Sequence, residues 1–218
     1  MRLVLLGPPG AGKGTMCMSI IEKYGLTHMS SGDILRAERA ANTELGQKAQ
    51  SYMDSGQLVP DDVIIGMMIG AIENAEGGYV LDGFPRTVLQ GEELDKALEG
   101  IGAKIDAIVD LQVPDEVIEA RMTGRRSCPS CGGVYHIKNL KPKVEGQCDK
   151  GCGDLVQRSD DNAEVVANRL KIYHEQTAAV VGYYKGVGKK IIEINANQAV
   201  DDVKASVIAE LDKLDKAD

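Results

Sequence analysis

The stretch that decides the fold is Leu3-Val4-Leu5-Leu6-Gly7-Pro8-Pro9-Gly10-Ala11-Gly12-Lys13-Gly14-Thr15. Its apolar start predicts a buried β-strand, and the glycines that follow allow backbone N–H groups to approach an anion. Gly-x4-Gly-Lys between a strand and a helix is typical of the P-loop, which binds a nucleoside triphosphate and whose lysine adds a positive charge. An ordinary glycine turn is the alternative, but the strand context and the extra Gly10 favour phosphate binding. Ser or Thr usually follows the lysine directly; here Gly14 intervenes, so Thr15 supplies the hydroxyl expected near Mg²⁺.

Short apolar runs recur along the chain and predict the strands of a parallel sheet. They lie at residues 3–6, 79–81, 107–111 and 191–194, with a weaker run at residues 26–29. Helical patterns between them indicate right-handed βαβ units. The fold class expected is therefore α/β, a parallel five-stranded sheet covered by helices on both faces, with ligands bound at the carboxyl ends of the strands.

Two segments interrupt the alternation of strands and helices. Residues 30–60 are polar and helix-prone with no predicted strand, and residues 127–158 are rich in Gly, Cys, Pro and Lys. Each is interpreted as an insertion that can move as a unit over the sheet. Residues 200–218 carry apolar positions among charges, which predicts a final amphipathic helix that covers the core.

The composition argues against several classes of function. The 218 residues carry a formal net charge of -8, which disfavours binding of nucleic-acid phosphates along a broad basic face. No apolar run approaches the roughly 18 residues that suggest a membrane span, and the residues before the glycines lack the length of a secretory signal. We therefore expect a cytoplasmic protein with no nucleic-acid or membrane partner and, by default, a monomer.

Charged residues elsewhere fit phosphoryl transfer, which needs positioning and charge neutralisation more than covalent chemistry. Asp82 ends a predicted strand, the position at which P-loop enzymes hold Mg²⁺, although an Asp there also suits a turn. Arg121 and Arg125 are four residues apart, which predicts that they share a helix face. The candidate arginines are Arg36, Arg86, Arg121, Arg125, Arg158 and Arg169.

Five motifs occur in order along the chain: Gly7 to Thr15, Ser31-Gly32-Asp33-Ile34-Leu35-Arg36, Leu81-Asp82-Gly83-Phe84-Pro85-Arg86-Thr87, Gly124-Arg125-Arg126 and Arg158-Ser159-Asp160-Asp161. Their order and spacing resemble those of adenylate kinases over nearly the whole chain. The resemblance implies reversible, Mg²⁺-dependent phosphoryl transfer from ATP to AMP, giving two ADP. It also implies a P-loop core of residues 1–29, 60–125 and 159–218, a mobile AMP-binding insertion of residues 30–59 and a mobile lid of residues 126–158.

The resemblance implies a role for each matching residue. Those expected to bind ATP are Gly10, Ala11, Gly12, Lys13, Gly14, Thr15, Arg121, Arg125, Val134, Tyr135 and Gln198. Those expected to bind AMP are Ser31, Arg36, Gln57, Leu58, Val59, Gly83, Phe84, Pro85, Arg86, Gln90, Arg158 and Arg169. The catalytic set is Lys13, Arg86, Arg125, Arg158 and Arg169, while Asp82 and Thr15 would support Mg²⁺. The amide of Gln90 has donors and acceptors, so it is the candidate for contacting the edge of adenine.

Four cysteines are clustered in the expected lid. Cys128-x2-Cys131 and Cys148-x3-Cys152 have nearly the spacing of a structural tetrahedral zinc site. A lid of this size buries little apolar surface, and a bound metal would supply the folding free energy that it lacks. Metal-binding lids occur in the resembling family. Zinc is expected, or another thiolate-binding divalent metal such as iron or cobalt. The resembling lids usually separate the second pair by two residues, so the fourth ligand is Cys152 or, alternatively, His136 or Asp149.

Two other functions compete with this interpretation. A UMP or CMP kinase would share the P-loop, but its lid would usually be short and Gln90 argues against it. A zinc-ribbon nucleic-acid-binding protein with a nucleotide-binding domain would explain the cysteines, but the acidic balance disfavours it. Cys17, His28 and His174 are expected to be structural.

Overall fold

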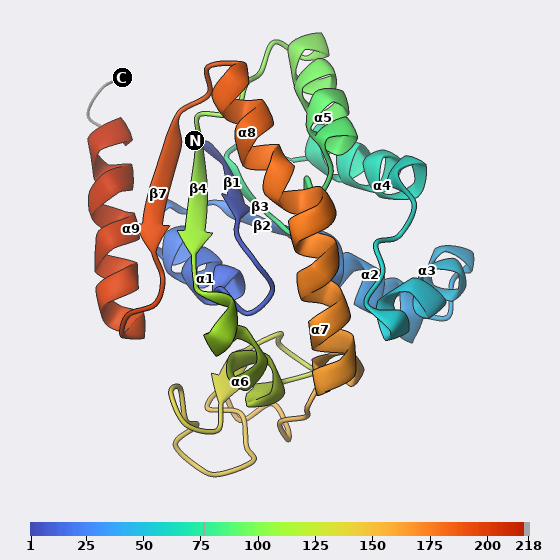
Figure 1. The fold of residues 1–218 in the computed structure, drawn as a ribbon, viewed down its shortest axis with the longest axis vertical. Coiled ribbons are helices and arrows are strands. Elements are labelled where there is room, and N and C mark those ends of the chain that lie inside the picture. The colour runs from blue at the N-terminus through green and yellow to red at the C-terminus, as the bar shows by residue number, and fades with distance from the viewer. Residues whose placement is uncertain (76, 216–218) are drawn as a thin grey trace.

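A parallel β-sheet forms the centre of the computed structural model, which describes residues 1–75 and 77–215 (Figure 1). Within these residues the sheet has five strands in the order β2 (Thr27–Ser30), β3 (Tyr79–Asp82), β1 (Arg2–Leu6), β4 (Ala107–Gln112) and β7 (Ile191–Asn195). All neighbouring pairs are parallel. The expected α/β class is confirmed, and each predicted strand is present with its ends shifted by one residue at most.

The first strand occupies the middle of the sheet. Its alternate side chains face opposite sides, so Val4 and Leu6 belong to one hydrophobic core while Leu3 and Leu5 belong to the other. A strand buried on both faces must be apolar at every position, which is why the run is continuous. The chain proceeds from β1 to β2 and β3 on one side and later to β4 and β7 on the other. The loop after β1 therefore lies where the strand order reverses, the usual ligand position in such sheets.

Helices cover both faces of the sheet, as expected (Figure 1). One face packs against α1 (Lys13–Tyr24) and α9 (Val200–Asp215), and the other against α4 (Asp61–Glu73), α5 (Val88–Gly100) and α8 (Ala178–Gly186). The predicted final helix is thus confirmed as α9, while its last three expected positions, residues 216–218, lie outside the described residues. In the described ranges no helix combines the length and hydrophobicity needed to cross a bilayer.

The first interrupting segment folds into two helices, α2 (Ser31–Ala40) and α3 (Glu44–Ser55). Each begins at a residue whose hydroxyl accepts a backbone N–H, Ser30 from Asp33 at 3.2 Å and Thr43 from Gly46 at 3.1 Å. Such caps satisfy N–H groups that have no partner within the helix. The prediction of no strand from residue 30 is wrong only at Ser30, which ends β2 opposite Asp82.

The 3₁₀ turn η1 (Asp115–Val117) leads directly into α6 (Ile118–Thr123), and the second interrupting segment follows α6. Two short strands, β5 (Arg125–Ser127) and β6 (Val134–His136), pair antiparallel at its base. The chain then returns through the 3₁₀ turn η2 (Ser159–Asp161) to α7 (Ala163–Ile172), and a π-helical turn η3 (Tyr173–Thr177) joins α7 to α8.

The prediction that Arg121 and Arg125 share a helix face is wrong. The helix α6 ends at Thr123, and Arg125 is the first residue of β5. The carbonyl of Gly124 accepts the N–H of Ile137 at 3.0 Å, so pairing with the segment after β6 takes the place of further helical bonds. The spacing of four residues therefore spans a helix end rather than one turn.

Candidate active site

A cavity of about 760 Å³ opens at the carboxyl ends of the strands. It is lined by every residue expected to bind ATP, namely Gly10, Ala11, Gly12, Lys13, Gly14, Thr15, Arg121, Arg125, Val134, Tyr135 and Gln198. It is also lined by Ser31, Arg36, Gln57, Leu58, Val59, Gly83, Pro85, Arg86, Gln90, Arg158 and Arg169 from the set expected to bind AMP. Phe84 is the exception, because its side chain is fully buried in the hydrophobic core on one side of the sheet.

The glycine-rich loop packs closely against the strand next to it. Gly7 has φ +134°, and a Cβ there would lie 2.5 Å from the carbonyl oxygen of Leu111 on β4, so only glycine fits. The loop carbonyls curl around the next basic residue: Lys13 Nζ donates to Gly7 O at 2.7 Å and to Pro8 O at 2.9 Å. Lys13 is also the first residue of α1, so the loop that holds the ammonium group leads into the unpaired N–H groups of a helix start. The two together form an anion-binding surface.

Burial makes the ammonium of Lys13 unusually acidic. It lowers the pKa of Lys13 to about 8; the charge of Asp82 opposes the shift, while the charges of Arg86 and Arg169 add to it. A phosphate bound in the loop would add negative charge close to this ammonium group and raise the pKa of Lys13 again.

Asp82 lies beside the loop at the end of β3. A Cβ on Gly14 would be 3.8 Å from its Oδ2. Burial raises the pKa of Asp82, but the contact with His28 and the charge of Lys13 outweigh this effect and hold it below its usual value. The carboxylate is therefore ionised. Its oxygens and the hydroxyl of Thr15, which lines the same cavity, suit a hard cation such as Mg²⁺.

His28, expected to be structural, lines the cavity. Its buried Nε2 lies 3.4 Å from Asp82 Oδ2 without the alignment of a hydrogen bond. The thiol of Cys17 is close to both groups, within 4.8 Å. Burial raises the pKa of Cys17 strongly, so this thiol stays protonated and packs as a small apolar side chain, as expected. A protonated thiol does not serve as a metal ligand.

Arginines from separate elements converge on the same cavity. Burial, followed by the charges of Arg125 and Arg36, lowers the pKa of Arg158 to about 10. Burial, followed by the charges of Arg125 and Arg86, likewise lowers the pKa of Arg169 to about 10 despite the opposing charge of Asp160. So many buried cations repel one another, and a polyphosphate would relieve that repulsion.

Two acidic residues of η2 hold part of this cluster in place. Asp161, with no exposed side chain, accepts from Arg125 Nε at 2.8 Å and Nη2 at 2.5 Å. Asp160 accepts from Arg169 Nη1 at 2.7 Å. The pairing with Asp161 is bidentate, which fixes the plane of the guanidinium group as well as its position. The sequence motif contained both acids, but only the fold shows which arginine each one holds.

The other end of the cavity carries the residues of the α2–α3 segment and the start of α5. Ser31 Oγ donates to Gly83 O at 2.6 Å, and Arg86 Nε donates to the same oxygen at 2.7 Å. Met53 and Ile64 add apolar walls that sequence analysis did not identify. Their only signal was hydrophobicity, which also marks residues of the core.

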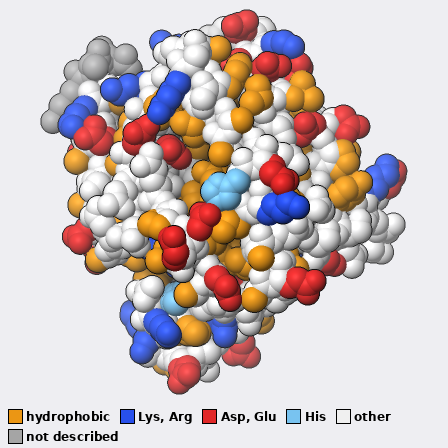
Figure 2. Space-filling model, viewed as in Figure 1, with side chains coloured by type: hydrophobic (Ala, Val, Ile, Leu, Met, Phe, Trp, Pro, Cys, Tyr) orange, Lys and Arg blue, Asp and Glu red, His pale blue; other side chains and the backbone are white. Residues whose placement is uncertain are grey.

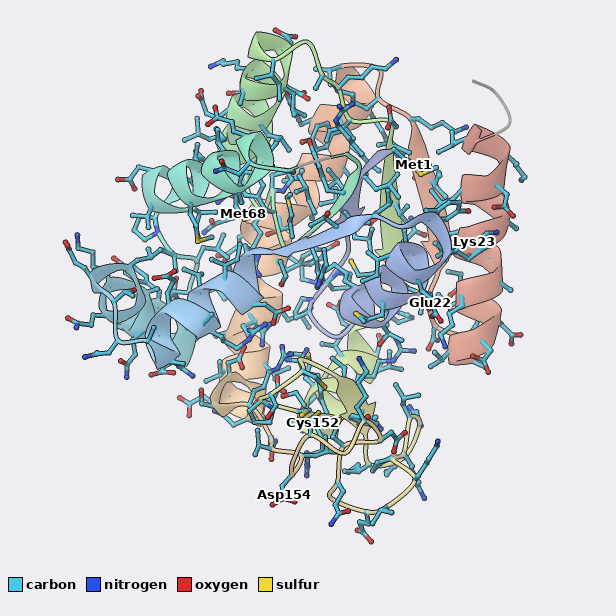
Figure 3. The ribbon with its side chains drawn as sticks, turned by 180° about the vertical axis from the view of Figure 1, so that it is seen from behind. Met1, Glu22, Lys23, Met68, Cys152 and Asp154 are labelled. Atoms are coloured by element: carbon cyan, nitrogen blue, oxygen red, sulfur yellow. The ribbon has the colours of Figure 1, made fainter. Side chains whose placement is uncertain are left out.

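The four cysteines of the second segment come together, Cys128 and Cys131 from the turn between β5 and β6 and Cys148 and Cys152 from the chain after β6. Their sulfur atoms lie within 4.8 Å of one another, with 3.4 Å between Cys128 and Cys152, 3.6 Å between Cys131 and Cys148, and 3.3 Å between Cys148 and Cys152. Figure 3 shows Cys152 among the loops of this segment, beside other sulfur atoms. A tetrahedron with Zn–S bonds of about 2.3 Å has sulfurs about 3.8 Å apart, so the cluster fits one thiolate-bound ion.

The extra residue between the last two cysteines is accommodated by the local backbone. Gly151, with φ +69°, allows the chain to turn so that Cys152 faces the other sulfurs. The two alternative ligands are engaged elsewhere. His136 Nδ1 accepts the N–H groups of Lys138 and Asn139 at 3.0 and 3.1 Å, and Asp149 Oδ1 accepts the N–H of Lys143 at 2.7 Å.

The fold and the cavity define a class of protein. A P-loop at the reversal point of a parallel sheet, with convergent arginines and a carboxylate at the end of the neighbouring strand, is the arrangement of P-loop phosphotransferases. The cavity volume lies in the upper range of small-molecule sites, which run from about 300 to 1,000 Å³.

Sequence comparisons narrow this class to one family. The sequence model described as Adenylate kinase matches residues 5–189. An adenylate kinase of Lachnospira eligens is 49% identical over 211 residues, covering 95% of this chain and 98% of the relative. An adenylate kinase of Clostridioides difficile is 46% identical over 213 residues (97% and 98%), and one of Lachnoclostridium phytofermentans is 47% identical over 216 residues (98% and 99%). The chain belongs to the adenylate kinase family of nucleoside monophosphate kinases.

Proposed function

We propose that this cavity binds ATP and AMP together and transfers the terminal phosphoryl group of ATP to AMP, reversibly, giving two ADP. The triphosphate lies on the P-loop, with its base and ribose near Val134, Tyr135 and Gln198. The monophosphate lies near Arg86, between Ser31 and Gln90. The observation that carries this assignment is the convergence of Lys13 and the buried arginines between these two ends of one cavity.

The chemistry needs no covalent enzyme intermediate. A phosphate oxygen of AMP forms the new bond to the terminal phosphorus of ATP while the bond to the bridging oxygen breaks, and the departing group is ADP. The arginines neutralise the charge of the transferring group and hold donor and acceptor in line. When Mg²⁺ accompanies ATP, Asp82 and Thr15 are the residues that would hold it, directly or through water, where it neutralises phosphate charge.

The two insertions are proposed to close over the bound nucleotides. The segment of residues 30–59 is the AMP-binding part and the segment of residues 126–158 is the lid, joined to the core of residues 1–29, 60–125 and 159–218. Closure would exclude water, which otherwise competes with AMP for the phosphoryl group.

A coupled assay with ATP and each of AMP, UMP, CMP and GMP in turn tests the acceptor. We expect AMP to give the highest kcat/KM, by about 100-fold or more, since Gln90 offers hydrogen bonds to one base edge only. A higher kcat/KM for UMP or CMP would overturn the assignment of the acceptor site.

The lid is proposed to bind one structural zinc ion, or another thiolate-binding divalent metal such as iron or cobalt, through Cys128, Cys131, Cys148 and Cys152. The sulfur separations support this ligand set. Four protein ligands leave no open position, so the ion stabilises the lid and takes no part in the chemistry.

Cys128→Ser tests that role, because Cys128 is 1% exposed and, unlike Cys131, does not line the cavity. We expect loss of bound metal by elemental analysis and a lower Tm, with kcat at low temperature close to that of the unsubstituted protein. Cys17→Ala is the matched control and should keep the metal. Loss of turnover at low temperature with an unchanged Tm would contradict a structural metal.

The protein is further proposed to work as a monomer in the cytoplasm, without nucleic-acid or membrane partners. None of the five cysteines forms a disulfide, which suits a reducing compartment. Acidic and basic side chains are interspersed over most of the face drawn in Figure 2, and the basic side chains gathered at its lower end form a small group rather than a broad face.

A further inference from the structure

The carboxylate of Asp61 holds the side-chain amide of Gln90. Asp61 belongs to none of the motifs found in the sequence. Asp61 is the first residue of α4, and Gln90 lies in the first turn of α5. Gln90 Nε2 donates to Asp61 Oδ1 at 2.7 Å, and the backbone N–H of Arg86 donates to Gln90 Oε1 at 2.7 Å. Gln90 is only 1% exposed, so both bonds are made away from bulk water, where they are strong.

The second oxygen of the carboxylate fixes its orientation. Asp61 Oδ2 accepts from the hydroxyl of Thr87 at 3.0 Å, and that hydroxyl accepts the backbone N–H of Gln90 at 3.2 Å. Thr87 is the N-cap of α5. Both carboxylate oxygens are therefore tied to the start of one helix, and α4 and α5 lie side by side (Figure 1).

These partners allow only one orientation of the Gln90 amide. Rotating it by half a turn would place its NH₂ group against the N–H of Arg86 and its oxygen against the carboxylate of Asp61. Two favourable contacts would become a donor–donor and an acceptor–acceptor contact, both buried, which is costly. An amide has two N–H donors and an oxygen with two acceptor sites, so one donor and one acceptor remain for a ligand in the cavity.

The order of this remaining donor and acceptor distinguishes two classes of purine. Adenine presents an amino donor at position 6 and an acceptor at N1. Hypoxanthine and guanine present the reverse, an acceptor at position 6 and a donor at N1. An amide that can rotate would pair with either class, whereas a fixed amide pairs with one.

We propose that Asp61 is a positioning residue that makes the acceptor site select a 6-aminopurine monophosphate over a 6-oxopurine monophosphate. The inference rests on the proposed contact between Gln90 and the base of AMP. Asp61 does not touch the base; it acts by holding the amide that does.

Asp61→Asn tests the proposal because the new amide keeps the shape but can either donate or accept. It removes the acceptor–acceptor contact that a rotated Gln90 would make with Asp61 and leaves only the donor–donor contact with the N–H of Arg86. The measurement is kcat/KM for AMP and for IMP on the same sample, at fixed saturating ATP. We expect the AMP-to-IMP ratio to fall by about tenfold or more, with the KM for ATP unchanged. A ratio from one sample does not depend on the fraction of protein that is folded.

Two controls separate selection from stability. Asp62→Asn makes the same charge change at an exposed neighbour and should leave the ratio and the Tm unchanged. Thr87→Val removes one bond to Asp61 and the cap bond from the backbone N–H of Gln90, but it leaves the bond between the Gln90 side chain and Asp61. It should therefore lower the Tm while the ratio stays near that of the unsubstituted protein. If Asp61→Asn does not fold, Asp61→Ser gives the same test, since a hydroxyl also donates or accepts.

The outcomes separate this inference from the proposed function. If Gln90→Ala leaves kcat/KM for AMP unchanged, the AMP site itself is wrongly placed. If Gln90→Ala lowers kcat/KM for AMP but Asp61→Asn or Asp61→Ser keeps the original AMP-to-IMP ratio, the role of Asp61 is overturned and the proposed function stands.

Discussion

Replacing Lys13 by alanine is expected to lower kcat at saturating ATP and AMP by about 10²–10³-fold. The ammonium group lies inside the phosphate loop, where Gly7 and Pro8 hold it by their carbonyl oxygens. It is buried, so its charge acts on a transferring phosphoryl group with little screening by water. Alanine removes that charge and leaves the loop glycines, and hence the local backbone, in place.

The measurement is kcat from the coupled assay, together with the Tm of the same preparation. Lys23→Ala is the matched control, since Lys23 lies on the same helix with its side chain 40% exposed and should retain full activity. A Lys13→Ala protein with nearly unchanged kcat would remove Lys13 from the catalytic set.

The same lysine predicts a pH dependence of ATP affinity. In the free protein burial lowers the pKa of Lys13 to about 8. Bound triphosphate favours the charged form and raises this pKa, so binding above pH 8 requires uptake of a proton. Affinity should therefore fall as the pH rises through 8. Calorimetry at pH 9 in two buffers of different ionisation enthalpy should detect this proton uptake, and Lys13→Ala should abolish it.

Replacing Asp161 by alanine is expected to lower the free energy of unfolding by about 3–5 kcal/mol. This carboxylate is fully buried and neutralises Arg125 through two hydrogen bonds. Its removal leaves a guanidinium group without its partner, beside the charges of Arg158 and Arg169. Unpaired buried charge, rather than the lost hydrogen bonds alone, makes the effect large.

Urea unfolding of the free protein and of its complex with a bisubstrate analogue checks this explanation. The phosphates of the analogue supply negative charge to the same arginines. The loss of unfolding free energy caused by Asp161→Ala should therefore be smaller in the complex than in the free protein, and this difference should exceed the one measured for the control variant. The control is Asp201→Ala, whose side chain is 93% exposed and whose loss should have little effect in either state. An equal deficit with and without the analogue would show that Asp161 does not act by neutralising the phosphate-binding arginines.

Much of the fold was predictable because its signals are local. Short apolar runs marked every strand of the central sheet to within one residue, and the run is uninterrupted in the middle strand β1, which is buried on both faces. The P-loop was predictable because glycine and lysine at fixed spacing have few other uses. By contrast, the prediction that Arg121 and Arg125 share a helix face is wrong, because backbone pairing at Gly124 ends the helix between them.

The sequence by itself determined the sheet, the phosphate loop and the clustering of four cysteines within one segment. These features depend on residue type and on distance along the chain. The tertiary structure decided that Cys152 joins the other sulfurs while His136 and Asp149 bond elsewhere, that Asp161 neutralises Arg125, and that Asp61 orients Gln90. These contacts join residues whose separation along the chain carries no signal, because only packing of the elements brings their polar atoms together.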